Sequence, residues 1–303
     1  MRLIIGTIAV LFIFFRVKND FLIAVNNLDL NHVDLFSLGL ALVLMFVNWA
    51  IEAVKWKYSI SDAEKVTVLK SFKLTLTGIT LGFLTPNRIG EIPARALLLN
   101  KNNFKEITVK TAVASFSQLL ITLLVGIIGL CLTFQNFNQF SNLLYLLPLL
   151  IIILFLLLLV YFKPNKLESV LNKFSFINKK QLFKGLSTFS MLELFNILLL
   201  SLVRYIVFTL QYYIVLKAFG VDLNTLNTIF LIPVCFMFAS FIPTLLISEI
   251  GVRGSVALFV FGMVSDMDIQ IVLASVILWL INVALPALLG LFNLKELKLI
   301  KED

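Results

Sequence analysis

Residues 74–99 read LTLTGITLGFLTPNRIGEIPARALLL, and this stretch decides the fold. Two apolar arms, Leu74–Leu84 and Ile89–Leu99, flank a break at Thr85-Pro86-Asn87. At 1.5 Å per residue, each arm reaches roughly 16 Å, about half of a hydrocarbon core of about 30 Å. Because neither arm can cross a bilayer alone, the stretch predicts a re-entrant hairpin. Its broken backbone must be buried in protein or line a watery cavity.

A second stretch of the chain repeats this pattern. Residues Ile229–Ile242 are apolar, the run breaks near Pro243, and it resumes as Gly251–Val264. These arms reach roughly 21 Å, so they too are short for a span. We expect the backbone to break at Pro86 and Gly90 in the first hairpin and at Pro243 and Gly251 in the second.

The composition of the whole chain points to a membrane protein. Of 303 residues, 60% are hydrophobic and only 14% are charged, which excludes a soluble fold of ordinary composition. The apolar runs are continuous and do not alternate with polar residues, so they favour helices over a β-barrel. Full helices are expected at residues 3–15, 36–54, 111–133, 143–162, 189–217 and 270–292.

The distribution of positive charge sets the expected topology. The formal net charge of +8 could indicate nucleic acid, but in a polytopic protein excess Lys marks cytoplasmic loops. With the N-terminus inside, 18 Lys and Arg fall on the cytoplasmic side and three outside. We therefore expect cytoplasmic N- and C-termini, no nucleic acid partner, and two hairpins that enter from opposite sides.

The predicted fold class is all-α: a polytopic helical membrane protein with about six full transmembrane helices plus two oppositely oriented re-entrant hairpins. Helix, hairpin and helix follow one another over 36–133 and again over 189–292, which is typical of the inverted repeats of secondary transporters. We expect a single transmembrane domain over residues 1–303.

Cations within the apolar segments are the candidate functional residues. No Lys is expected deep in such a segment, whereas four of the six Arg are: Arg88, Arg95, Arg204 and Arg253. The planar guanidinium grips phosphate or carboxylate through two parallel hydrogen bonds, so this choice of Arg suggests oxyanion recognition. Unpaired, four central Arg would cost on the order of 10 to 14 kcal/mol on insertion scales.

Acidic residues at helical spacing offset part of that cost. Glu91 lies four residues before Arg95, and Glu249 four residues before Arg253, so each pair shares a helical face. Arg88 lies one turn before Glu91 and can join the first pair. Two interpretations stay open, namely structural ion pairs and an anion site with surplus positive charge. For Arg204, a structural pairing with Glu193 or a hairpin carbonyl stands beside a functional role. The predicted lipid-phosphate site comprises Arg88, Glu91, Arg95, Arg204, Glu249 and Arg253.

The sequence does not contain the residue patterns that metal binding, a disulfide framework or nucleophilic catalysis requires. His32, Cys131 and Cys235 cannot form a zinc finger or a disulfide framework, and both cysteines lie in apolar runs. The chain has no phosphate-binding glycine loop and no nucleophile elbow. We therefore predict no cofactor, no metal site and no catalytic residue.

At these residues the sequence resembles a flippase-like integral membrane family that includes the transmembrane region of lysylphosphatidylglycerol synthase. Its first motif, Pro followed by Gly-Arg-Ile/Leu-Gly-Glu and an Arg, is similar to Pro86-Asn87-Arg88-Ile89-Gly90-Glu91 and Arg95, with Asn87 in place of Gly. Its second, Pro and then Gly-Gly-Leu/Ile-Gly-Val-Arg-Glu, is similar to Pro243 and Ser248-Glu249-Ile250-Gly251-Val252-Arg253-Gly254. Glu249 replaces a Gly there, and Gly254 replaces the final Glu.

The resemblance implies translocation of lipids between leaflets in a prokaryotic inner (plasma) membrane. The soluble aminoacyl-transferase domain of the synthases has no counterpart here, so lipid aminoacylation is not expected. Our first hypothesis is a flippase for an anionic, phosphate-bearing lipid. The alternative is a membrane-embedded lipid-modifying transferase, or an accessory subunit of a lipid or envelope glycan pathway. Membrane lipids are the expected partners, while coupling to protons or another ion and homo-oligomerisation stay open.

Overall fold

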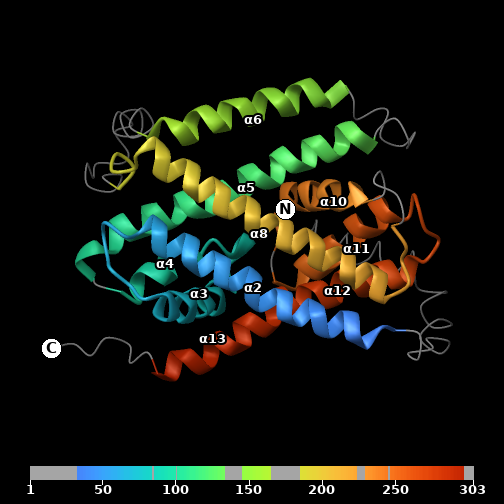
Figure 1. Ribbon diagram of the computed structural model, residues 1–303, viewed down its shortest axis with the longest axis horizontal. Coiled ribbons are helices and arrows are strands. Elements are labelled where there is room, and N and C mark those ends of the chain that lie inside the picture. Colours follow the sequence, from blue (N-terminus) through green and yellow to red (C-terminus); the bar gives the residue numbers. More distant parts are fainter. Residues whose placement is uncertain are drawn as a thin grey trace.

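The computed structural model describes residues 33–83, 85–99, 101–133, 145–164, 185–223, 229–244 and 246–296. These residues form helices and connecting turns without a β-strand (Figure 1). The longer helices are α2 (Leu35–Ser59), α3 (Val68–Gly82), α5 (Phe104–Thr133), α6 (Leu147–Phe162), α8 (Met191–Ala218), α10 (Leu231–Phe241), α11 (Leu246–Phe261), α12 (Asp268–Trp279) and α13 (Leu285–Glu296). Short helices are η2 (Pro86–Arg88), α4 (Glu91–Leu97), η3 (Lys101–Asn103) and η5 (Leu280–Ala284).

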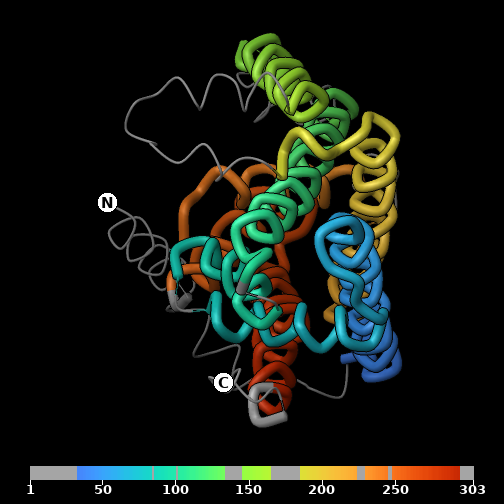
Figure 2. The backbone as a smooth tube through the Cα atoms, turned by 90° about the vertical axis from the view of Figure 1, so that its left-hand side faces the viewer, coloured from blue at the N-terminus to red at the C-terminus, as the bar shows by residue number. Residues whose placement is uncertain are grey.

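Four helical segments of the described residues are long and apolar enough to cross a membrane: α2, α5, α8 and Asp268–Asn293. The chain is therefore an integral membrane protein, and the prediction of an all-helical polytopic fold is confirmed. Helix α6, expected over 143–162, is shorter, with 16 residues, and lies at the edge of the molecule against α5 (Figures 1 and 2). The helix expected over 3–15 lies outside the described residues.

The last span is less regular than its apolar pattern predicts. It was expected as one helix over 270–292, but the π-helix η5 separates α12 from α13. Pro286 follows η5 and has no backbone N–H for the carbonyl one turn before it, which is a physical reason for the wider turn. Asn282 lies in η5, and its Oδ1 accepts a hydrogen bond from Asn48 Nδ2 of α2 at 3.2 Å.

Helices α2 and α8 lie side by side and run antiparallel (Figure 1). At one end, the backbone N–H of Asp34 donates to the carbonyl of Ala218 at 3.1 Å. At the other end, Asn196 Nδ2 donates to the Tyr58 hydroxyl at 3.0 Å. The first helix of each predicted repeat therefore faces the other along its whole length.

The remaining contacts also follow a two-fold exchange of the repeats. Helix α5 packs on α10, and the corresponding α13 packs on α3; likewise α4 packs on α5 as α11 packs on α12. Glycines allow both close approaches. A Cβ at Gly129 of α5 would lie 2.8 Å from the Phe230 carbonyl oxygen, and one at Gly290 of α13 would overlap the Leu76 carbonyl of α3. The arrangement agrees with the predicted inverted repeat.

Each hairpin leaves and returns at one end of the bundle. The first, α3 to α4, connects the end of α2 to the start of α5, on the left in Figure 1. The second, α10 to α11, connects the end of α8 to the start of α12, on the right. The two hairpins are oppositely oriented, as predicted.

Two buried lysines correct the expectation that Lys stays in loops. Lys55 of α2 and Lys110 of α5 have side-chain exposures of 0% and 1%. Helices α2 and α5 both extend beyond their apolar runs, so these Lys lie within a helix. Lys110 Nζ contacts both Asp62 carboxylate oxygens at 2.5 Å and Thr188 Oγ1 at 2.8 Å, which joins three segments at one end of the bundle.

Candidate functional site

The tips of the two hairpins meet directly. Asn87 has φ 48° and ψ 24°, and Arg88 has φ 55°, both in the left-handed region. Asn tolerates this conformation better than most residues, so Asn87 can occupy the position of a motif glycine. The Asn87 N–H donates to the Thr244 carbonyl at 2.9 Å, and the Thr244 N–H donates to Asn87 Oδ1 at 2.6 Å. We call this pair of contacts the tip clasp.

The predicted break residues divide into two groups. Pro86 begins η2, Gly90 precedes α4, and Pro243 lies between α10 and α11. Gly251, in contrast, lies within α11, which begins at Leu246. The second arm therefore begins earlier than predicted, because the helix already includes the polar residues that precede Gly251.

Glu249 holds two arginines from different hairpins. Its Oε1 accepts from Arg253 Nε at 3.0 Å and Nη2 at 2.9 Å, and from Arg88 Nη2 at 3.3 Å. The predicted pair of Glu249 and Arg253 is present. Arg88, however, pairs across the molecule and not with Glu91, because its left-handed backbone breaks the helical spacing assumed for that pairing.

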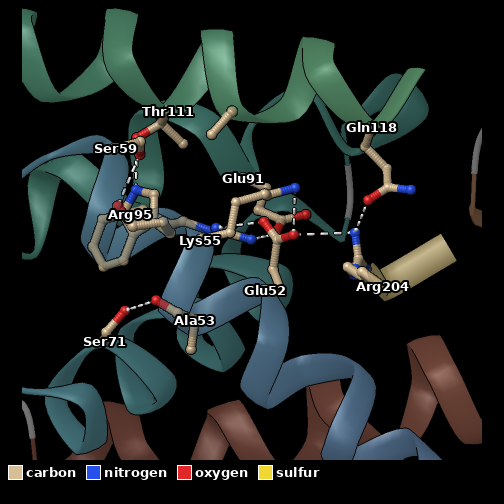
Figure 3. A network of polar contacts seen from close by, with 12 residues as sticks. Glu52, Ala53, Lys55, Ser59, Ser71, Glu91, Arg95, Thr111, Gln118 and Arg204 are labelled. Atoms are coloured by element: carbon tan, nitrogen blue, oxygen red, sulfur yellow. Dashed lines mark hydrogen bonds and ion pairs between the residues drawn. The ribbon is translucent and has the colours of Figure 1, made fainter. Parts of the chain in front are cut away.

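A second ion-pair network centres on Glu52, which sequence reasoning missed. Glu52 Oε1 accepts from Arg95 Nη1 at 3.1 Å, while Oε2 contacts Lys55 Nζ at 2.8 Å and Arg204 Nη1 at 3.1 Å. Figure 3 shows Arg95 and Lys55 on one side of Glu52 and Arg204 on the other. Glu52 is the only acidic residue within the apolar run 36–54, and this was the signal that could have identified it.

Arg95 is fixed on both of its sides. It also pairs with Glu91, as predicted, and its side chain is only 3% exposed. Two glycines of α3 make room for this arm. A Cβ at Gly78 would lie 2.6 Å from Arg95 Cγ, and one at Gly82 would lie 2.6 Å from the Glu91 backbone nitrogen.

Arg204 joins the same network from α8. Besides Glu52, its Nε donates to Asn48 Oδ1 at 3.0 Å and its Nη1 to Gln118 Oε1 at 3.3 Å. Its guanidinium lies 4.9 Å from the ring centre of Trp49. Glu193, one of the two structural partners considered for Arg204, does not pair with it: Glu193 forms a reciprocal capping box with Ser190 at the start of α8, three turns away.

Two cavities flank the meeting point of the tips. The first, of about 240 Å³, contains Arg88, Arg204, Arg253 and Glu249 on a wall that is otherwise a mixture of apolar side chains and uncharged polar ones. The second, of about 230 Å³, contains Lys55, Glu52, Glu91 and Arg95. Both cavities touch four common residues: Trp49, Arg88, Gln118 and Arg204.

Side-chain exposure separates the arginines. Arg88 and Arg253 are 24% and 26% exposed and Arg204 is 18% exposed, whereas Arg95 is buried. Arg88 pairs through Nη2 alone and Arg253 through Nε and Nη2, so each keeps donors outside these ion pairs. The first cavity can therefore offer several N–H groups to an oxyanion.

The model of the family described as "Lysylphosphatidylglycerol synthase TM region" matches residues 2–290. The chain belongs to this family. Searches among curated proteins and among solved structures gave no significant match. Membership of the lysylphosphatidylglycerol synthase transmembrane-region family supports a function that involves membrane lipids. Within the matched range, Asn87 occupies a left-handed position, and Glu249 supplies the carboxylate that pairs with Arg253.

Proposed function

We propose that this protein is a lipid flippase that moves an anionic, phosphate-bearing lipid between leaflets. The observation that carries the proposal is the first cavity, where three partly exposed arginines and one carboxylate lie at the meeting point of two broken helices. Unwound tips with charged side chains are the usual substrate sites of inverted-repeat transporters.

The cavity is suited to a headgroup and not to a whole lipid. Its volume of about 240 Å³ lies below the roughly 300–1,000 Å³ of pockets that enclose drug-sized molecules. Phe208, Phe236 and Val252 contribute apolar wall beside the arginines. In the proposed complex the phosphate binds to Arg88 and Arg253, and the acyl chains stay outside in the lipid.

The two ion-pair networks have different proposed roles. Glu249 orients Arg88 and Arg253 toward the cavity, with Arg204 as a third donor. Arg95, with Glu52 and Glu91, acts as a positioning group that fixes the first hairpin against α2. Because Arg88 and Arg204 line both cavities, a headgroup that passes the tip clasp stays in contact with cations.

The proposed setting is a prokaryotic inner membrane with both termini cytoplasmic. The loops that join α2 to α3 and α4 to α5 lie at the Lys-rich end of the bundle, which the positive-inside rule assigns to the cytoplasm. The expected partners are membrane lipids.

Reconstitution tests the proposal. The purified chain is placed in liposomes with lipids labelled on an acyl chain: phosphatidic acid, phosphatidylcholine or diacylglycerol. We expect faster transbilayer movement of phosphatidic acid than in protein-free liposomes, and little effect on diacylglycerol. Unchanged movement of all three lipids would contradict a flippase, and a chemically altered lipid on chromatography would favour the transferase alternative.

A further inference from the structure

The charged groups around both cavities do not balance. In the part of the chain that the structure describes, the walls contain five basic side chains, Lys55, Arg88, Arg95, Arg204 and Arg253, and three carboxylates, Glu52, Glu91 and Glu249. The difference is a net charge of +2. The first cavity alone gives the same figure, with three arginines against one glutamate.

An uncompensated charge of +2 is costly inside a membrane protein. A charge in low dielectric needs a partner of opposite sign, because the lost hydration is otherwise not replaced. The carboxylates are already shared: Oε1 of Glu249 serves two arginines, and Glu52 serves three cations. A bound ligand with two negative charges would neutralise the cavity walls. A ligand with one negative charge would leave a net charge of +1.

We infer that the lipid recognised here carries a terminal phosphoryl group with two negative charges, as a lipid phosphomonoester or diphosphate does, and not a singly charged phosphodiester. The inference rests on the proposed function, because it assumes that the first cavity binds a lipid phosphate. A phosphomonoester carries about −1.5 to −2 at pH 7, with a second pKa near 6.

The geometry of the donors agrees with this charge count. Arg88 Nε and Nη1 and Arg253 Nη1 lie outside the ion pairs with Glu249, and Arg204 approaches the same cavity from α8. A terminal phosphoryl group presents three free oxygens, one more than a phosphodiester, so it can accept from all three arginines. Charge-assisted contacts of this kind are the strong hydrogen bonds of proteins.

A matched pair of ligands tests the inference. Dioctanoyl phosphatidic acid and its phosphate methyl ester have the same chains and differ by one charge at pH 8. Binding of each to the detergent-purified chain is measured by titration calorimetry. We expect the monoester to bind about ten- to a hundredfold more tightly, the value of one further charge-assisted contact. Dioctanoylglycerol diphosphate forms a third arm: its terminal phosphoryl group carries two charges and its bridging phosphate one more, so it should also bind more tightly than the methyl ester.

Two variants separate net charge from the shape of the guanidinium. Arg253→Gln lowers the net charge of the site to +1. The ratio of the affinity for the monoester to that for the methyl ester should therefore fall toward one. Arg253→Lys keeps +2, so it should weaken both ligands and preserve the preference. Thermal unfolding of each variant checks that it is folded.

The outcomes separate this inference from the function on which it rests. Equal affinity of the wild-type chain for monoester and methyl ester would overturn the dianion and leave a phosphate site in place. An unchanged preference in folded Arg253→Gln would also overturn it. Failure of all three lipids to bind would remove the phosphate site itself, and with it the proposed function.

Discussion

Neutralising Glu52 is the sharpest test of the buried network. Its carboxylate contacts Lys55, Arg95 and Arg204 at nitrogen–oxygen distances between 2.8 and 3.1 Å, and its side chain is 4% exposed. With charges about 4 Å apart and an effective dielectric constant of about 20, each contact contributes about 4 kcal/mol. Desolvation of the buried ions offsets much of this sum, so Glu52→Gln should destabilise the protein by roughly 3 to 5 kcal/mol.

Thermal unfolding in detergent measures this effect. At roughly 2 °C per kcal/mol, we expect a midpoint at least about 6 °C below wild type. Glu106→Gln is the matched control, since Glu106 is 37% exposed and 3.8 Å from Lys110, and it should change stability by at most about 1 kcal/mol. The double variant Glu52→Gln, Lys55→Met should recover only part of the loss, because it removes one of the three cations that Glu52 contacts while Arg204 still lacks a carboxylate. A midpoint for Glu52→Gln equal to wild type would refute the central role of Glu52.

Three further predictions concern the tips, the helix contact and the topology. Cysteines at Asn87 and Thr244, in a background without native cysteines, should form a cross-link that stops lipid movement until a reductant is added; continued flux in cross-linked protein would show that the tip clasp need not open. Gly78→Ala should lower the unfolding midpoint by several degrees, because its methyl group would overlap the adjacent Arg side chain, and an unchanged midpoint would contradict that packing. Lys65→Cys should be protected from an impermeant thiol reagent on intact cells while Asp266→Cys reacts; labelling of both would refute the assigned orientation.

The fold could be predicted because its signals are local. A run such as 74–99 contains its own break, and opposite placement of Lys around two such runs predicts opposite orientation. Sequence reasoning could not locate the ends of α2 and α5, because a helix stabilised by packing continues past its apolar run into polar residues. The π-helix η5 was missed for a related reason, because one widened turn does not change the pattern of apolar residues enough to be recognised in the sequence.

The candidate site was only partly accessible from the sequence. Pairs four residues apart, such as Glu249 and Arg253, follow from helical geometry and are present. Contacts between distant segments do not follow from spacing, so Glu52 was overlooked and the carboxylate partner of Arg88 was expected in the wrong hairpin. The surplus of positive charge was anticipated, but its distribution over two cavities depends on how α2 and α8 bring Glu52 and Arg204 together.

The transbilayer movement of a phosphate-bearing lipid by Arg253→Lys tests the central claim most directly. The substitution keeps the charge beside Glu249 but removes the planar fork, while Lys105→Arg, at an exposed position of α5, controls for a simple exchange of the two residues. If Arg253 grips the phosphate, folded Arg253→Lys should move the lipid about ten- to a hundredfold more slowly than wild type, and Lys105→Arg should match wild type. Wild-type movement by Arg253→Lys would contradict the account.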